Sequence, residues 1–217
     1  MRIAVLGSGS HNNAVVVESG GRWILIDAGF SCREIERRLE EVGVDPGTLG
    51  AVVVTHEHSD HARGVDVLVR RHGLPLYATA GTLAECRLSD EVGTPARVLA
   101  SGVPVAVEGF EIEPFAVPHD AREPVGLVVE SADGRRLGLV ADLGSRSRLA
   151  WGRLADLDLL ILEANHDLEM LRNGPYPWAL KQRVASRHGH LSNRDAADGL
   201  AELLSDRLRR VVLYHLS

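Results

Sequence analysis

The sequence has few cysteines and no long apolar run. Cys32 and Cys86 are the only cysteines among 217 residues, too few for a disulfide framework. The apolar segment Ile3–Leu6 is too short for a signal peptide, and no segment approaches the length of a membrane span. We therefore expect a cytoplasmic protein with no membrane association, whose cysteines pack in the interior.

Basic charge is also scarce. The formal net charge is −6, and Lys181 is the only lysine among the 24 basic residues. This balance argues against a protein that binds nucleic acid through a globally basic surface. It does not exclude an anionic substrate, because bound divalent metal ions would concentrate positive charge where a phosphate docks.

Length and patterning predict one domain that covers residues 1–217. With 45% hydrophobic residues the chain suffices for a substantial core. Two β-rich halves that each carry helices indicate an α+β (α/β) protein, a sandwich of sheets with helices outside. We expect strands at residues 2–7, 14–18, 22–26, 51–54, 75–78, 157–163 and 210–215, more strands between 103 and 143 with a hairpin turn at Asp133–Gly134, and helices at 31–43, 62–72, 81–88 and 193–204.

The segment after the first predicted strand looks like the start of a dinucleotide-binding fingerprint. Gly7 and Gly9 match the first two glycines of the G-x-G-x-x-G pattern. However, Asn12 stands where the third glycine belongs, and a strand follows rather than a helix. We therefore expect a tight hairpin, with Asn12 or Asn13 in the left-handed backbone conformation.

Three histidines and an aspartate follow the apolar run Ala51–Val54 within a few residues. His56 and His58 are two residues apart and project to the same side of an extended chain, and Asp60 and His61 follow where the chain turns. Neutral imidazole and carboxylate are natural donors for zinc, iron or manganese. The alternative is a solvated loop that happens to be rich in histidine, but surface loops rarely gather four such donors so tightly.

This H-x-H-x-D-H arrangement resembles the signature of the metallo-β-lactamase fold superfamily, in which the remaining ligands are single residues at the ends of later strands. The chain offers His119 after residues 115–118, Asp142 after residues 137–141, and His190 in the segment 189–193. Alone, a histidine or aspartate at a strand end is more often a cap or turn residue, and only the order beside the motif favours ligands. The resemblance implies a four-layer αββα fold.

The same resemblance implies two divalent metal ions, Zn²⁺ or Mn²⁺, with iron also possible. One ion would take His56, His58 and His119, and the other Asp60, His61 and His190, with Asp142 bridging. Two ions roughly 3.5 to 4 Å apart can hold a hydroxide between them and neutralise the charge of a phosphorane-like transition state. No side-chain nucleophile is then required, so neither cysteine is a candidate.

Several further segments resemble the WalJ/YycJ branch of the superfamily. They are Ser8-Gly9-Ser10 with Asn13, and residues 163–171, 173–178, 189–193 and 215–217. Members of this branch are cytoplasmic proteins regarded as metal-dependent nucleases with 5′-to-3′ exonuclease activity on DNA, more distantly related to tRNase Z and RNase J. The resemblance implies a nucleic-acid partner, single-stranded or 5′-ended DNA. The sequence departs from the branch at Asn12, usually glycine, and it ends where relatives continue into a loop and helix.

Three side chains are candidates for catalysis. Asp60, besides binding metal, could orient the attacking hydroxide or accept its proton. His166 follows a strand end beside Glu163-Ala164, and in tRNase Z a histidine beside the related dipeptide serves as general acid, so His166 is either a catalytic or phosphate-contacting residue or a structural loop histidine. His215 ends the last predicted strand, as a support of the ligands or a substrate contact.

An aromatic and basic cluster precedes the last ligand and contains Tyr176, Trp178, Lys181 and Arg183. These side chains suit base stacking and phosphate contacts on single-stranded nucleic acid, although a rigid loop that packs on the domain is equally open. A hydrolase of small esters, thioesters or lactones is the alternative enzyme. A non-enzymatic metal-binding or interaction module is the third class, which the complete ligand set favours least.

Overall fold

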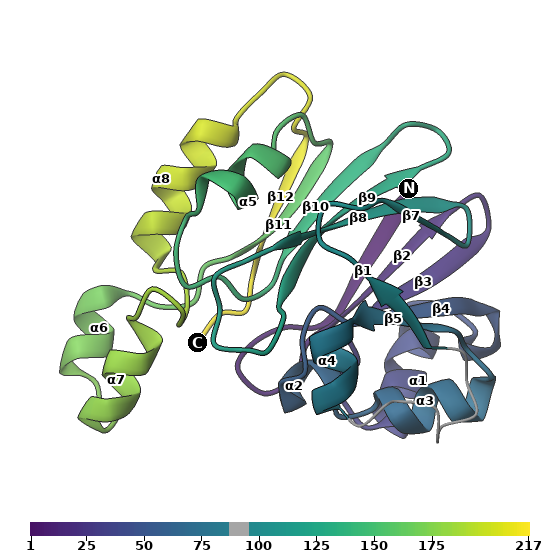
Figure 1. The fold of residues 1–217 in the computed structure, drawn as a ribbon, viewed down its shortest axis with the longest axis horizontal. Helices are drawn as coiled ribbons and strands as arrows, with labels where there is room; N and C mark the ends of the chain where they lie inside the picture. Colours follow the sequence, from purple (N-terminus) through teal and green to yellow (C-terminus); the bar gives the residue numbers. More distant parts are fainter. Residues whose placement is uncertain (87–95) are drawn as a thin grey trace.

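The computed structural model describes residues 1–86 and 96–217. Two six-stranded sheets pack face to face, and helices lie on the outer side of each sheet (Figure 1). The first sheet and its helices come from the first half of the chain, and the second sheet comes from the second half. The four-layer αββα arrangement expected from the sequence is therefore confirmed.

The first sheet has the strand order β1-β2-β3-β4-β5-β6. Its first three strands pair antiparallel, and β3 to β6 pair parallel. Parallel neighbours need crossover connections, which helices supply here. The strands are β1 (Arg2–Gly7), β2 (Ala14–Ser19), β3 (Arg22–Ile26), β4 (Leu49–Val53), β5 (Leu76–Thr79) and β6 (Ala96–Leu99), and the helices are α1 (Cys32–Glu41), η1 (Pro46–Thr48), α2 (Ser59–Ala62), α3 (Val65–His72) and α4 (Ala80–Glu85).

The helix predicted at residues 62–72 is present as α3, which begins at Val65 and is separated from α2 by residues 63 and 64. The chain breaks at Gly64, whose N–H donates to the carbonyl of Ala28 (2.8 Å). A Cβ at Gly64 would lie 2.1 Å from the carbonyl oxygen of Phe30, so the break follows from this close approach. Helix α4 ends at Glu85, and the end of the helix predicted at 81–88 falls on residues outside those described.

The second sheet has the order β12-β11-β10-β9-β8-β7. Strands β7 to β10 pair antiparallel and β10 to β12 pair parallel. The predicted turn between β9 and β10 is present, with Gly134 at φ 75°. The strands are β7 (Val105–Val107), β8 (Phe110–Ala116), β9 (Val125–Ser131), β10 (Arg136–Val140), β11 (Leu159–Glu163) and β12 (Arg210–Tyr214), and the helices are α5 (Arg148–Arg153), α6 (Leu168–Asn173), α7 (Trp178–Val184) and α8 (Asn193–Leu203).

Helices α5 and α8 lie against the outer face of the second sheet, whereas α6 and α7 lie to one side, below α8 in the view of Figure 1. The sequence did not predict α5, α6, α7 or the short strand β6. The helices have only six or seven residues each, too few to show a helical period. None of the helices in the described ranges has the length and hydropathy that a membrane crossing requires.

Apolar side chains form three layers of core. Val15 and Val17 of β2 face the second sheet in the central layer, whereas Val16 faces the helices that cover the first sheet. Leu127 and Leu139 reach the central layer from the second sheet. Because successive residues of a strand point to opposite faces, strands buried on both faces must be apolar throughout.

This core fixes where the polar strand ends lie. The parallel strands β3, β4, β10, β11 and β12 end at the same edge of the sandwich, and β8 also ends there. Asp27, the His56–His61 loop, His119, Asp142 and His215 each come directly after one of these strands or within three residues of it. Ligand sites of α/β proteins form at such an edge, because the loops that follow the strands converge.

Candidate metal centre

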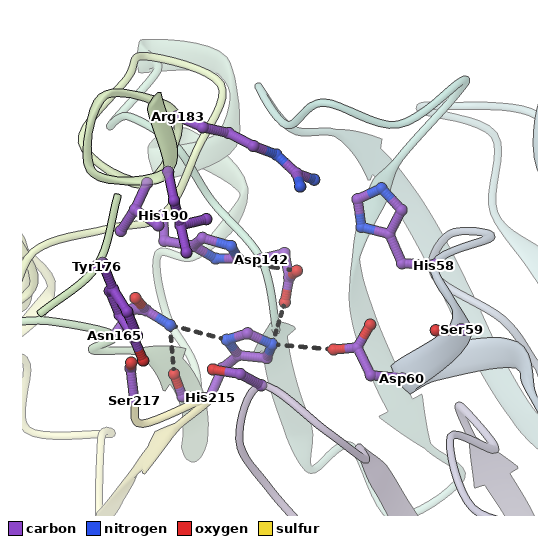
Figure 2. Close-up of a pocket in the computed structure, with 13 residues that line it drawn as sticks. His58, Ser59, Asp60, Asp142, Asn165, Tyr176, Arg183, His190, His215 and Ser217 are labelled. Carbon is purple, nitrogen blue, oxygen red and sulfur yellow. Dashed lines mark hydrogen bonds and ion pairs between the residues drawn. The ribbon is translucent and has the colours of Figure 1, made fainter. Parts of the chain in front are cut away.

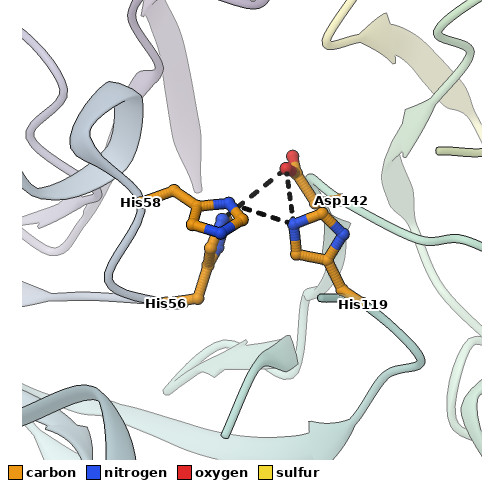
Figure 3. A group of neighbouring side chains, drawn as sticks. All are labelled: His56, His58, His119 and Asp142. Atoms are coloured by element: carbon orange, nitrogen blue, oxygen red, sulfur yellow. Dashed lines mark hydrogen bonds and ion pairs between the residues drawn. The ribbon is translucent and has the colours of Figure 1, made fainter. Parts of the chain in front are cut away.

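Four side chains from three loops form a first group of donors, which Figure 3 shows. His56, His58, His119 and Asp142 each offer one ligand atom, and these atoms lie within 4.8 Å of one another. His119 Nε2 is 3.3 Å from Asp142 Oδ2, and His56 Nε2 is 3.6 Å from the same oxygen. His119 Nδ1 donates to the carbonyl of Gly189 (3.0 Å), which leaves Nε2 of the neutral ring as an acceptor toward the group.

A second group lies on the other side of Asp142. His61 Nε2 is 3.4 Å from both Asp60 Oδ2 and Asp142 Oδ1. His215 Nε2 is 3.3 Å from Asp60 Oδ2 and 3.4 Å from Asp142 Oδ1 (Figure 2). Asp142 therefore turns one carboxylate oxygen toward each group, the position that a bridging carboxylate would take.

Two atoms of this cluster show that it suits a cation. His56 Nε2 and Asp142 Oδ1 are buried, and neither has a hydrogen-bond partner within the part of the chain that the structure describes. Buried polar atoms are nearly always paired, because an unpaired one costs about 1 to 3 kcal/mol. Imidazole and carboxylate donors with inward-pointing atoms fit divalent transition-metal ions.

A buried aspartate that the sequence analysis did not single out holds His61 in place. Asp27 follows β3 with a left-handed backbone (φ 60°), and its Oδ2 is 2.8 Å from His61 Nδ1. Its Oδ1 accepts the N–H of Thr55 at 2.8 Å. Asp27 fixes the His61 ring with Nε2 toward the second group, as carboxylate partners of metal-binding histidines do. Its signal in the sequence is the same as that of Asp142, an aspartate directly after an apolar strand.

Asn13 is a second side chain whose place near the site only the fold reveals. It is buried, and its Nδ2 lies 3.1 Å from Asp60 Oδ2 and 3.0 Å from His61 Nε2. The expectation of a left-handed Asn12 or Asn13 is wrong, because Gly9 takes the positive φ of this turn (123°). Gly9 adopts it without steric cost, and its N–H donates to Asn13 Oδ1.

His190 lies beside the second group in a different bonding arrangement. Its Nδ1 is 2.7 Å from Glu163 Oε1 but 4.0 Å from Asp142 Oδ2. Glu163 is fully buried at the end of β11, and its Oε2 accepts the backbone N–H groups of Leu143 (2.6 Å) and Leu191 (3.0 Å). Glu163 therefore fixes the loop of Asp142 and the loop of His190 together. The sequence had grouped His190 with Asp60 and His61, and the structure brings His215 closer to that pair.

The charges of the cluster are strongly coupled. Burial and the neighbouring His61 hold the pKa of His56 well below its ordinary value. Burial opposes a charge on His61, but the carboxylates of Asp142 and Asp27 raise the His61 pKa well above its usual range. Burial and the charge of Asp142 raise the pKa of Glu163. The carboxylates thus favour positive charge at His61, at the place where a cation would also be stabilised.

The cysteines have the properties of packing residues. Cys32 is buried, and burial raises its pKa above the ordinary value. Burial and the charge of Glu57 raise the pKa of Cys86 to about 12. A nucleophilic cysteine needs a lowered pKa, so neither thiol is poised for attack.

Members of both donor groups line an open cavity of about 390 Å³, namely His58, Asp60, Asp142 and His215 (Figure 2). A neighbouring cavity of about 490 Å³, bordered by the loop of residues 7–12, shares three lining residues with it. The shared residues are Ser10, Tyr176 and Ser217. The two cavities therefore adjoin one another at these residues.

The predicted substrate contacts are divided between the cavity and the outer surface. Tyr176 lines both cavities, and Arg183 lines the first. Trp178 is 69% exposed on α7 and lines neither of these two cavities. The ammonium of Lys181 donates to the carbonyl of Arg172 (2.7 Å), so it links α7 to α6 instead of facing the cavity.

His166 is buried next to the site but does not line the cavity. Its Nδ1 lies 3.3 Å from Asn165 Oδ1, and its Nε2 has no hydrogen-bond partner among the described residues. Burial and the nearby His190 lower the pKa of His166. Asn165 is the member of this segment that lines the cavity, and its Nδ2 donates to the carbonyl of His215 (2.9 Å).

Comparison with known proteins extends these observations to the whole chain. The family model described as "Beta-lactamase superfamily domain" matches residues 22–216. Exodeoxyribonuclease YycJ from Bacillus anthracis is 36% identical over 219 residues, which cover 100% of this chain and 83% of that protein. Exodeoxyribonuclease WalJ from Streptococcus pneumoniae serotype 2 is 37% identical over 220 residues, which cover 100% and 81%.

A solved structure shows the same fold at lower sequence identity. Zn(2+)-bound PqqB from Methylobacterium extorquens superposes with a TM-score of 0.76 at 20% identity, covering 100% of this chain and 89% of that one. The family match includes strands β3 to β12 and every loop that carries a residue of the donor groups. The chain therefore belongs to the β-lactamase superfamily.

Proposed function

We propose that this protein is a metal-dependent nuclease that shortens DNA from its 5′ end. The observation that carries the proposal is the two donor groups on either side of Asp142, which border an open cavity with Arg183 at its mouth. The two relatives named exodeoxyribonucleases, 36% and 37% identical over the full chain, support DNA as the substrate. Phosphodiester hydrolysis needs positive charge next to the phosphate, which the donor groups offer once cations are bound to them.

Two divalent ions would occupy the centre, zinc or manganese, with iron as a further candidate. The first would be held by His56, His58, His119 and Asp142. When bound, such ions supply an activated water near neutral pH and neutralise charge on the phosphate. The side chains of the protein then bind, orient and protonate the substrate.

We assign the second position to Asp60, His61 and His215, with Asp142 shared between both positions. The 3.3 and 3.4 Å distances from His215 Nε2 to the two carboxylates support this choice. It revises the expectation that His190 is the last ligand. Asp60, whose Oδ2 also contacts Asn13, would act as a ligand and orient the attacking water.

His190 would protonate the leaving oxygen. Its Nδ1 is held by the buried Glu163 at 2.7 Å, and the ring lines the cavity. This orientation leaves Nε2 facing the substrate. Because burial lowers the pKa of His190, the ring would take up a proton only during the reaction before it passes that proton to the leaving oxygen. His166 is buried and does not line the cavity, so we assign it a packing role.

Tyr176 and Arg183 would guide the DNA into the site. Tyr176 lies where the two cavities meet, so a base stacked on its ring would place the following phosphate over the metal centre. Arg183 would contact a phosphate at the mouth. Trp178 and Lys181 would contact the DNA farther from the metal centre, through the exposed face of α7.

We also propose that residues 1–217 form one hydrolase domain that works in the cytoplasm. The central core supports the first point, because residues of both sheets interdigitate in it. Limited proteolysis that releases a stable half would contradict a single domain, and cell fractionation would test the location.

The test is a comparison of substrate classes at equal metal concentration. Oligonucleotides labelled at the 5′ or the 3′ end should lose the 5′ label first, as mononucleotides, and a thioester and a lactone should turn over far more slowly. Asp142→Asn is the inactive control, since it removes the shared carboxylate. Faster hydrolysis of the thioester or the lactone than of DNA would replace the nuclease with a small-molecule hydrolase.

A further inference from the structure

Among residues 1–86 and 96–217, Arg183 is the only arginine or lysine that lines the metal-centre cavity. Its side chain reaches from α7 across the mouth, and its tip lies between His190 and His58 in Figure 2. The guanidinium Nε donates to Asp120 Oδ2 at 2.6 Å. Asp120 directly follows His119, and neither the sequence pattern nor the proposed chemistry has so far given it a role.

The two oxygens of Asp120 face different partners. Oδ2 accepts from Arg183, and Oδ1 lies 3.4 Å from His119 Nε2 and 3.9 Å from His58 Nε2. The carboxylate thus connects the arginine to the first donor group. Only Nε of Arg183 has a hydrogen-bond partner among the described residues, so both terminal Nη groups remain available at the cavity.

The backbone around this contact is held tightly. The carbonyl of Gly189 accepts from His119 Nδ1 (3.0 Å), and the carbonyl of Val184 accepts the N–H of His190 (2.9 Å). A Cβ at Gly189 would lie 2.2 Å from the carbonyl oxygen of Arg183. The end of α7 is therefore fixed relative to both histidines, which sets the separation of Asp120 and Arg183.

The surroundings explain why a fixed cation is useful here. Asp60 and Asp142 also face the cavity, so the entrance repels a phosphate unless a positive group meets it. The side chain of Arg183 is 59% exposed, and without a partner it would sample many rotamers. A single hydrogen bond at Nε orders the guanidinium and leaves its terminal donors free for a phosphate oxygen.

We propose that Asp120 and Arg183 form a phosphate subsite beside the metal centre, in which Asp120 positions Arg183 and Arg183 binds the substrate. This inference rests on the proposed phosphodiester substrate. Arg183 touches the phosphate, and Asp120 acts through Arg183. Substrates without a phosphate gain nothing from the pair.

The experiment is a double-mutant cycle with Asp120→Ala, Arg183→Ala and the combined variant. KM and kcat are measured for a 5′-phosphorylated single-stranded oligonucleotide and for bis(4-nitrophenyl) phosphate, and oligonucleotide binding to the metal-free variants is followed by fluorescence anisotropy. Arg183→Ala should raise KM about ten- to a hundredfold, the loss expected for a charge-assisted hydrogen bond. Asp120→Ala should raise KM by less, change kcat less than KM, and add almost nothing when Arg183 is already alanine.

Two further variants guard against misfolding. Asp120→Asn keeps an oxygen that accepts from Nε, so it should restore most of the lost affinity. Asp66→Ala removes the carboxylate of an exposed ion pair with Arg70 on α3, away from the site, and should leave KM and kcat unchanged. Recovery by asparagine cannot come from a collapsed loop.

Three results would overturn the inference. A lower KM for Asp120→Ala would mean that the Asp120 carboxylate only repels the substrate. An equal effect of Asp120→Ala on KM with and without Arg183 would mean that Asp120 acts independently of Arg183. Loss of a metal ion from Asp120→Ala would mean that Asp120 is a metal ligand. Turnover of the small phosphodiester without any action on DNA would refute the proposed nuclease, while the cycle on the small substrate would still test the pair. Failure on both phosphodiesters would refute both proposals.

Discussion

Replacing His215 and His190 separately by alanine distinguishes a metal ligand from a proton donor. The two rings stack with centroids 5.0 Å apart, and both line the same cavity. They differ in what their nitrogens contact. His215 Nε2 faces Asp60 and Asp142 at 3.3 and 3.4 Å, whereas His190 Nδ1 is bound to Glu163 at 2.7 Å.

The expected magnitudes follow from these contacts. Loss of a side chain that only supports a ligand already lowers metal affinity about 10- to 100-fold. His215→Ala should therefore lower the metal affinity of the second position by at least about 100-fold. His190→Ala should keep the metal content, because His190 lies outside the group formed by Asp60, His61 and His215. Its kcat should fall by about 10²- to 10⁴-fold, the usual contribution of general acid catalysis.

The assay combines elemental analysis after gel filtration with kcat on the best oligonucleotide. Wild type and His190→Ala should each carry about two ions per chain, and His215→Ala about one. Circular dichroism confirms that both variants keep the fold. If His190→Ala loses an ion and His215→Ala retains both, our exchange of the two roles is incorrect.

Further predictions address the other parts of the site. Asp60→Ala and His61→Ala should abolish hydrolysis while circular dichroism stays native-like, and near wild-type turnover in either would contradict the second position. Glu163→Gln should lower kcat about 10- to 100-fold, since an amide N–H facing His190 Nδ1 reverses the ring tautomer; an unchanged kcat would remove Glu163 from the mechanism. Tyr176→Ala and Trp178→Ala should each weaken single-stranded DNA binding roughly ten- to a hundredfold if a base stacks there. Unaltered binding by Trp178→Ala would confine the DNA to the cavity side of α7. Because the pKa of His61 is raised, metal binding should release the proton of His61 near neutral pH, and metal affinity should rise with pH. Calorimetry in buffers of different ionisation enthalpy measures the released proton, and its absence would contradict this prediction.

The sequence predicted the donors that lie close in the chain far better than those that meet through the fold. His56, His58, Asp60 and His61 share one loop, so their spacing alone places them together. Asp27 reaches His61 from a different strand end. Its position after an apolar strand marks it as a candidate, but the sequence does not show which side chain it contacts. Such contacts depend on strand order, which a local pattern does not encode.

The choice between His190 and His215 shows the same limit. Both histidines follow Asp142 in the chain, and each is followed by Leu-Ser, so order along the chain cannot separate them. The parallel pairing of β11 with β12 separates them, because it sets Glu163 beside Tyr214 and brings His215 over Asp142. Sequence reasoning gave the family and the fold, and the pairing of these strands suggested the revised roles.

The shared central core has a consequence for how the protein folds. Val15, Val17 and Ile26 of the first sheet pack against Leu127 and Leu139 of the second. Either sheet alone would expose a continuous apolar face together with unpaired edge strands, a combination that promotes aggregation. The halves must therefore dock before either is stable, so urea unfolding should be a single cooperative transition, and folding should be slow because the packing joins residues far apart in the chain.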